Sequence, residues 1–246
     1  MIIRDPRVLS AIKRLKSARV VYFVMSIKGG VGKTTVSVLL ALGFTQLRGR
    51  TGLLDLDFVN PSTHVLLGLK PGDISYSEHY GLVPFKVGNL LYFTIAPFTR
   101  ELVLPLRGKA AQNLLWEVLS VVSWNSLEVL IVDTPPGLGD EHLEVLYKLK
   151  DVIKPIVVTT PSKLAATSVE HFVKVLRDIG YHRVYLLENM GEGLLKPLAE
   201  ELGARYVGNI PWIRELESCT GSYSCLCELS KQFAKNIIEE LERSST

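Results

Sequence analysis

Apolar, β-branched segments alternate with segments of helical periodicity along most of this chain. The apolar segments are short and lack alternating polar positions, which is typical of strands covered on both faces of a sheet. They predict strands at residues 20–26, 51–56, 90–96, 127–132, 153–160, 182–188 and 205–209. The segments between them predict helices at residues 33–48, 109–122, 141–150, 163–179, 192–202 and 228–243. This alternation predicts an α/β fold with a mostly parallel, doubly wound sheet of about seven strands.

The chain has 246 residues, of which 47% are apolar, and it contains no internal repeat, low-complexity tract or long polar linker. We therefore expect a single domain over residues 1–246, large enough to bury a core on both faces of the sheet. The least regular stretch, residues 68–90, is rich in glycine and proline and predicts a mobile loop or a small insertion.

Composition also restricts where the protein works. No apolar run approaches the roughly 20 residues that span a bilayer, and the start of the chain lacks the pattern of a secretory signal. Its three cysteines, an odd number placed late in the chain, do not form the framework of a secreted disulfide-rich domain. We therefore expect a cytoplasmic protein.

The net charge of +3 is concentrated at the N-terminus, because residues 1–19 carry six lysines and arginines against one aspartate. Asp5 and Pro6 predict the start of a basic helix, whose face of apolar residues consists of Val8, Leu9, Ile12 and Leu15. The basic face fits an anionic partner, such as nucleic acid or a membrane, or a helix docked by its apolar residues. We favour docking, because the apolar face is short and has no aromatic residue.

The last predicted helix, residues 228–243, carries apolar residues at four-residue spacing, namely Leu229, Phe233, Ile237 and Leu241, among several glutamates. A helix that binds anionic membranes is basic on its polar face. We therefore expect this helix to dock on the protein's own core.

Residues Lys28–Thr35 read K-G-G-V-G-K-T-T and lie between a predicted strand and a predicted helix, which is the setting of a phosphate-binding loop. Consecutive N–H groups of such a loop surround an anion, and the N-terminus of the following helix adds its positive end. The residues expected to bind nucleotide phosphates are Gly29, Gly30, Val31, Gly32, Lys33, Thr34 and Thr35, with Lys33 contacting the β- and γ-phosphates. The usual formula has a glycine where this chain has Ile27, and a second lysine, Lys28, precedes Lys33.

Two aspartates stand at the ends of predicted strands, Asp57 after residues 51–56 and Asp133 after residues 127–132. In open α/β sheets ligands bind outside the carboxyl ends of the strands, so both carboxylates should approach the loop. Mg²⁺ prefers oxygen ligands and keeps several waters. We expect Thr34 to bind Mg²⁺, Asp133 to hold a metal-bound water, and Asp57 to orient the attacking water near the metal. Alternatively, Asp57 caps a short helix after Pro61 and Asp133 is a turn residue.

Several motifs resemble one group of ATPases. A loop of the form K-G-G-x-G-K-[ST] is the signature of the deviant Walker A ATPases, which have the P-loop NTPase architecture. The segment Asp133-Thr-Pro-Pro-Gly-Leu-Gly-Asp-Glu-His142 resembles that of the Mrp/ApbC family of ATP-dependent iron–sulfur cluster carriers, within the MinD/ParA superfamily. Asp55-x-Asp57-x-x-Asn-Pro-Ser62 resembles the family's D-x-D-x-x-G-P-S, with Asn60 in place of glycine. Further matches, between about residues 20 and 215, are Arg107-Gly108, Trp124, Thr159-Thr160-Pro161, Glu188-Asn189-Met190 and Ile210-Pro211.

The resemblance implies Mg²⁺-dependent ATP binding and hydrolysis by a nucleotide-sandwich homodimer, in iron–sulfur cluster assembly or metalloprotein maturation with an unknown client protein. Lys28 would then reach the partner's nucleotide and neutralise charge that develops in the transition state. Asn189 would read the adenine edge, and the backbone near Pro211 would flank the ring. Independently, the chain has no N-K-x-D sequence of the kind that reads guanine.

The cysteines depart from the family pattern. Iron–sulfur carriers of this family have C-P-x-C shortly after the E-N-M segment, whereas here Met190 is followed by residues 191–197 without a cysteine. The chain has instead Cys219, Cys225 and Cys227. They are either thiols packed near the last helix or, through Cys225 and Cys227, ligands of an iron–sulfur cluster or zinc shared across a dimer.

Two other functions remain open from the sequence. One is an ATP-switched positioning or partitioning protein like MinD or ParA, which would bind a membrane or DNA and whose support is the basic N-terminus. The other is an ATP-binding adaptor that does not hydrolyse its nucleotide.

Overall fold

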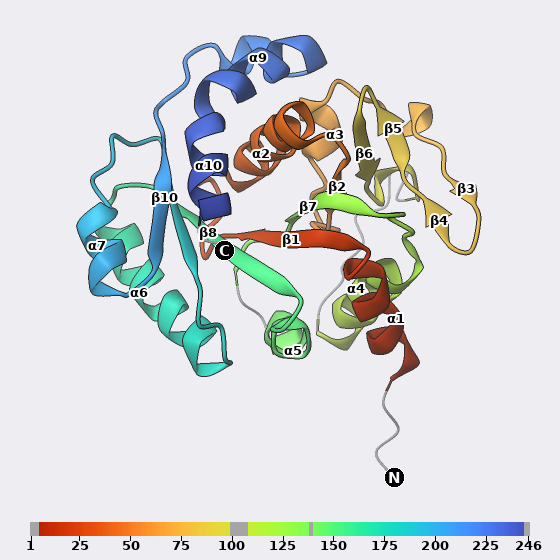
Figure 1. Cartoon of the computed structure of the whole chain (residues 1–246), viewed down its shortest axis with the longest axis horizontal. Coiled ribbons are helices and arrows are strands. Elements are labelled where there is room, and N and C mark those ends of the chain that lie inside the picture. The colour runs from red at the N-terminus through yellow and green to blue at the C-terminus, as the bar shows by residue number, and fades with distance from the viewer. Residues whose placement is uncertain (1–4, 99–107, 138–139, 244–246) are drawn as a thin grey trace.

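The computed structural model describes residues 5–98, 108–137 and 140–243 (Figure 1). Its helices are α1 (Pro6–Leu15), α2 (Lys33–Arg48), α3 (Thr63–Leu66), α4 (Lys109–Val121), α5 (Asp140–Leu149), α6 (Lys163–Asp178), α7 (Lys196–Glu201), α8 (Leu216–Cys219), α9 (Tyr223–Phe233) and α10 (Lys235–Arg243). Its strands are β1 (Ala18–Met25), β2 (Thr51–Asp55), β3 (Ser77–Glu78), β4 (Leu82–Val83), β5 (Phe85–Val87), β6 (Leu90–Phe93), β7 (Leu127–Asp133), β8 (Ile153–Thr159), β9 (Tyr185–Asn189) and β10 (Arg205–Ile210). Short 3₁₀ turns occupy Pro71–Asp73 and Ala96–Phe98.

One eight-stranded sheet has the order β10-β9-β8-β1-β7-β2-β6-β5 and confirms the predicted α/β architecture. The seven predicted strands all belong to it and run parallel to one another. The eighth strand, β5, pairs antiparallel with β6 at one edge and comes from the stretch expected to be irregular. That stretch also forms the separate β3–β4 pair.

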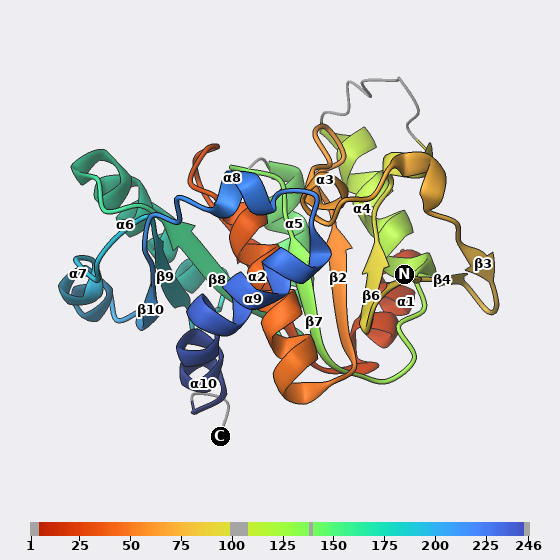
Figure 2. The ribbon, with the colours of Figure 1, turned by 90° about the horizontal axis from the view of Figure 1, so that it is seen from above.

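Two apolar layers cover the sheet, one on each face (Figure 2). Strand β1 serves both, because Val21 and Phe23 face one layer while Tyr22 and Val24 face the other, as the two-residue period of a strand requires. Helices α1, α4, α5, α6 and α7 contribute to the first layer. Helices α2, α9 and α10 contribute to the second. The central strands are therefore apolar on both faces, which explains why they lack polar alternation.

Strand β1 has β8 on one side and β7 on the other, while β2 lies beyond β7. The connections from β1 to β2 and from β7 to β8 therefore leave in opposite directions. In doubly wound sheets this reversal opens a crevice at the carboxyl ends of the strands. The loop that follows β1 lies at this point of the fold.

Helix α1 begins after Asp5, whose carboxylate accepts a hydrogen bond from the backbone N–H of Arg7. The helix packs against α4. Ala11 and Leu15 are buried, whereas Leu9 is 55% exposed, contrary to its expected place on the apolar face. The buried positions follow the 11–15 row of the helix, and Leu9 lies off that row. The Arg14 guanidinium donates to Ser123 Oγ at 2.9 Å, so part of the basic face is used within the chain.

The C-terminal region forms two helices rather than the single helix predicted over 228–243. Helix α9 ends at Phe233. The next residue, Ala234, caps it by donating its N–H to the Ser230 carbonyl, and α10 then runs in a new direction (Figure 1). Ser230 Oγ donates to the Leu39 carbonyl at 2.7 Å, which attaches α9 to α2. Ile237 and Leu241 of α10 are fully buried in the same layer, so the expected docking on the core does occur.

The predicted helix 192–202 is also shorter in the structure, where α7 begins at Lys196. Among the described helices, none has both the length and the apolar character that crossing a bilayer requires.

Candidate functional site

The loop between β1 and α2 has the conformation of a phosphate-binding loop. Gly32 caps α2 with φ of +79°, in the left-handed region that favours glycine. A Cβ at Gly32 would lie 2.2 Å from Asn189 Nδ2, so this position has no room for a side chain. That same amide donates to the Val31 carbonyl at 2.8 Å. The loop and the end of β9 are therefore packed together, with Lys28, Gly29 and Gly30 exposed in front of them.

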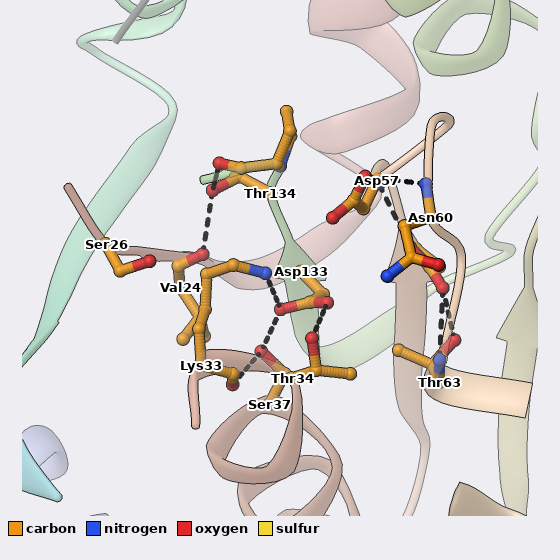
Figure 3. A network of polar contacts seen from close by, with 12 residues as sticks. Val24, Ser26, Lys33, Thr34, Ser37, Asp57, Asn60, Thr63, Asp133 and Thr134 are labelled. Atoms are coloured by element: carbon orange, nitrogen blue, oxygen red, sulfur yellow. Dashed lines mark hydrogen bonds and ion pairs between the residues drawn. The ribbon is translucent and has the colours of Figure 1, made fainter. Parts of the chain in front are cut away.

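Asp133 collects three donors from the start of α2 (Figure 3). Its Oδ1 accepts from Lys33 Nζ at 2.7 Å and from Ser37 Oγ at 2.7 Å, and its Oδ2 accepts from Thr34 Oγ1 at 2.9 Å. Ser37 was not foreseen from the sequence, although it lies four residues after Lys33 and therefore on the same helix face. The arrangement brings the predicted Lys33, Thr34 and Asp133 together.

The Lys33–Asp133 pair is buried, with side-chain exposures of 6% and 1%. Burial raises the pKa of Asp133, and the charge and hydrogen bond of Lys33, with the hydroxyls of Ser37 and Thr34, oppose that rise. A carboxylate and a hydroxyl side by side are hard oxygen donors of the kind that Mg²⁺ prefers, so these residues fit the expected metal.

The Thr-Pro-Pro-Gly segment after β7 is attached to the end of β1. Thr134 Oγ1 donates to the Val24 carbonyl at 2.9 Å, and Gly137 N donates to the Ser26 carbonyl at 2.9 Å. These bonds hold the segment beside the phosphate-binding loop. Arg107, Leu138 and Gly139, which belong to the motifs noted in the sequence, lie outside the described residues.

Asp55 is a second buried carboxylate beside this cluster, because β2 and β7 pair with Asp55 opposite Asp133. It accepts from Thr63 Oγ1 at 2.6 Å, from Thr63 N at 3.3 Å and from Asp57 N at 3.0 Å. Burial, with the charge of Asp133 as the second cause, raises the pKa of Asp55 to about 7.

This pKa predicts a pH-dependent stability. Because the pKa in the folded chain lies above the ordinary value of 3.8, folding favours the protonated Asp55, and this contribution is lost as pH rises from about 4 to about 7. We compare the melting temperatures of Asp55→Asn and the wild type at two pH values. Relative to the wild type, the variant should be more stable at pH 8 than it is at pH 5. The stability of the variant relative to the wild type should change by about 2 kcal/mol between the two pH values, which corresponds to a change of roughly 4–8 °C in melting temperature. Calorimetry of the ligand-free proteins measures it, and a difference that does not vary with pH would contradict the assignment.

Asp57 lies on the loop between β2 and α3, and its Oδ1 accepts from Asn60 N at 3.1 Å (Figure 3). This bond closes the turn at Asn60. Asp57 does not cap α3, the alternative expected from the sequence, because the residue that precedes α3 is Ser62. It also lines a pocket of about 350 Å³, together with Pro135, Pro136 and His142. Asp57 therefore uses one carboxylate oxygen for a hydrogen bond within the turn, and its side chain borders a pocket beside the segment that follows Asp133.

A larger pocket of about 520 Å³ adjoins the phosphate-binding loop at Thr35. Its walls include Thr35, Asn189 and Pro211, so three residues predicted to bind the nucleotide line one cavity. Trp212, which is 69% exposed, also lines it and was not singled out in the sequence. Thr35 belongs to both the phosphate-binding loop and this pocket, so the two adjoin at that residue.

Glu188 organises the segment that follows Asn189. Its Oε1 accepts from the N–H groups of Gly193 and Leu194 at 3.1 and 3.2 Å, and its Oε2 accepts from Leu195 N at 2.8 Å and Tyr206 Oη at 3.2 Å. These bonds hold residues 191–195 in a loop, which is why α7 starts later than predicted. The sequence identified Glu188 as part of a motif but gave no sign of this role.

The structure does not bring Cys225 and Cys227 together as a ligand pair. Cys219 and Cys225 form a disulfide, and Cys227, partly buried, lies two positions further along α9. Residues two positions apart on a helix do not face each other. Within residues 5–98, 108–137 and 140–243, no group of three or more His, Cys, Asp or Glu side chains is arranged to hold a metal ion.

Comparison with known proteins shows to which family the chain belongs. Residues 17–243 match the ParA family, described as NUBPL iron-transfer P-loop NTPase. The chain is 32% identical over 251 residues to the cytosolic Fe-S cluster assembly factor Nubp2 homolog of Aedes aegypti, covering 92% of this chain and 96% of that one. It is also 32% identical over 205 residues to the iron-sulfur cluster carrier protein of Rickettsia typhi, covering 82% of this chain and 62% of that one.

Solved structures agree with this result. A nucleotide-binding protein from Archaeoglobus fulgidus, solved in complex with ADP, matches with a TM-score of 0.75 and 26% identity over 94% of this chain and 96% of that one. The MinD cell division protein of Aquifex aeolicus shares the fold, with a TM-score of 0.59 and 19% identity over 87% of this chain and 95% of that one. The chain therefore belongs to the ParA/NUBPL family of iron-transfer P-loop NTPases.

Proposed function

We propose that this protein binds and hydrolyses ATP with Mg²⁺ as a homodimer, in the service of iron–sulfur cluster assembly. The observation that carries the proposal is the set of contacts among Lys33, Thr34 and Asp133 directly behind the phosphate-binding loop. A cation, a hydroxyl and a carboxylate in this arrangement serve phosphates and Mg²⁺ together. The pocket lined by Asn189 and Pro211 supports an adenine nucleotide as the ligand.

In this proposal Lys33 changes partner when the nucleotide enters. Its ammonium is held by Asp133 at 2.7 Å and would move toward the β- and γ-phosphates, and the Asp133 carboxylate would then help to hold Mg²⁺ through a water. The Thr34 hydroxyl would be a ligand of Mg²⁺, and the metal would supply positive charge that neutralises the phosphate oxygens. Ser37 continues to donate to Asp133 and keeps that carboxylate in place.

Asp57 orients the attacking water, and Lys28 acts on the nucleotide of the partner subunit. Asp57 borders a pocket beside the Thr-Pro-Pro-Gly segment, which gives a water room to bind there. Lys28 is exposed on the outer side of the loop, as a residue that reaches another copy must be. A cation supplied in this way stabilises charge on the transferring phosphoryl group.

The iron–sulfur part of the proposal rests on the family and on the names of the relatives. A cluster would be cargo, and the cysteines of this chain do not form a ligand set within the subunit, because Cys225 is bonded to Cys219. We therefore assign no cluster-transfer step to these residues. Anaerobic reconstitution with iron and sulfide tests the carrier role: visible absorption would support it, and protein that remains colourless and free of iron would remove it.

Mixing two inactive variants tests the shared site. Asp57→Asn should lower kcat by about 100-fold or more, since it removes the group that orients water. Lys28→Ala should also reduce turnover. In an equal mixture, half of the dimers are mixed, and in each of these the Lys28→Ala subunit keeps its own Asp57 and receives the partner's intact Lys28. We therefore expect about one quarter of wild-type activity to return.

The exposed Asp178 at the end of α6 supplies the control, because Asp178→Asn makes the same charge change far from the loop and should leave turnover unaltered. If mixing restores nothing although each variant exchanges subunits, Lys28 does not act across a dimer. If the wild type hydrolyses no ATP, the protein is a nucleotide-binding adaptor.

A further inference from the structure

The hydroxyl of Thr63, at the start of α3, joins three parts of the molecule that approach the nucleotide site. We propose that Thr63 is a positioning residue, which holds the Asp57 loop in place through Asp55. The proposal rests on the proposed function, because its kinetic effect presumes that Asp57 orients the attacking water. Thr63 does not itself reach the reacting atoms.

Asp55 is the point to which the loop is attached. It is the last residue of β2, is 1% exposed, and accepts from Asp57 N at 3.0 Å through Oδ1. Its other oxygen, Oδ2, accepts from both the N–H and the hydroxyl of Thr63. The carboxylate therefore connects the beginning of the loop, at Asp57, with its end, at Thr63.

A second hydroxyl completes this chain of hydrogen bonds. Thr63 Oγ1 lies 2.7 Å from Tyr92 Oη, and both side chains are fully buried. When Asp55 is ionised, the Thr63 hydroxyl donates its hydrogen to Asp55, and Tyr92 then donates to Thr63. The order Tyr92, Thr63, Asp55 runs from β6 to β2, so Thr63 acts as both acceptor and donor, which valine in its place cannot do.

Helix α3 is also attached at its far end, independently of Thr63. Gly221 N donates to the Leu66 carbonyl at 3.0 Å, and a Cβ at Gly68 would lie 2.2 Å from the Gly221 carbonyl oxygen. Leu67 is buried between these contacts. Removing the Thr63 hydroxyl should therefore leave α3 packed in its place and increase the mobility of residues 56–62, which precede α3.

Three variants separate positioning from simple stability. Thr63→Val keeps the shape but removes the hydroxyl, and we expect kcat to fall about tenfold or more, with KM for MgATP changed less than about twofold. Thr63→Ser restores the hydroxyl and should recover turnover to within about threefold of the wild type. Thr45→Val is the matched control, because Thr45 Oγ1 donates at 2.7 Å to the Ala41 carbonyl inside α2, away from the site.

Amide hydrogen exchange of residues 56–62 supplies a readout that needs no turnover. Exchange should accelerate in Thr63→Val and return toward the wild-type rate in Thr63→Ser, while the residues of β1 and β7 stay protected in both. Unchanged exchange and kcat in Thr63→Val would overturn the proposal, as would equal losses in the valine and serine variants. A wild type without ATPase activity would refute the proposed function, and the exchange measurement would still decide whether Thr63 holds the loop.

Discussion

Replacing Lys33 by alanine is expected to reduce ATP turnover by about 100-fold to 1,000-fold, which is the effect of losing one preorganised group that stabilises the transferring phosphate. The same change should destabilise the ligand-free protein. Lys33 pairs with Asp133 at 2.7 Å in a buried setting, so its removal leaves a buried carboxylate with only hydroxyl partners. We expect a loss of about 3 kcal/mol, at the lower end for a broken buried pair, because Thr34 and Ser37 remain.

The two effects of Lys33→Ala can be separated with a second substitution. Lys33→Ala combined with Asp133→Asn removes the unpaired charge, so the melting temperature should return toward that of the wild type while turnover stays low. Phosphate release and thermal unfolding measure the two quantities. Recovery of turnover in the double variant would show that Lys33 acts only by neutralising Asp133.

Glu188→Ala should produce the largest loss of stability among changes outside the phosphate-binding loop. The fully buried carboxylate accepts from three backbone N–H groups and from the Tyr206 hydroxyl, and alanine would leave these donors without an acceptor. At about 1–3 kcal/mol for an unsatisfied buried group, and allowing for water that enters, we expect a loss of about 3 kcal/mol or more. For a chain of this size that lowers the melting temperature by roughly 6–12 °C.

The neighbouring Glu192 provides the control for this experiment, because it is exposed in the same loop. Glu192→Ala should change stability by less than about 0.5 kcal/mol. If both alanine variants melt at the same temperature as the wild type, the bonds of Glu188 do not hold residues 191–195.

The sheet was predictable because its central strands are buried on both faces and therefore appear in the sequence as continuous apolar runs. Strand β5 was not, since Phe85–Val87 is a three-residue edge strand within a stretch rich in glycine and proline. The break between α9 and α10 was also missed. The four-residue spacing of apolar positions continues across Ala234, and only packing against α2 and β10 turns the chain.

Some residues of the candidate site were likewise predictable from the sequence, and others were not. Lys33, Thr34 and Asp133 were predictable because a local motif and a strand end suffice to place them. The role of Thr63 was not, because it depends on β6 and β2 lying side by side, which no local pattern encodes. The bonds of Glu188 to residues 193–195 and the pairing of Cys219 with Cys225 span only a few positions, but they depend on the loop conformation, which the spacing of these residues in the sequence does not reveal.

The long separation between Lys33 and Asp133 also affects how the protein folds. The two residues are 100 positions apart, and Asn189 is 158 positions from the Val31 carbonyl that it contacts. Such contacts form only after the parallel strands have paired, and chains dominated by distant pairings fold slowly. The phosphate-binding loop, although continuous in the sequence, therefore acquires its final shape late. A nucleotide that binds only the completed loop would draw refolding chains toward the native state by mass action, so its presence should improve recovery from denaturant.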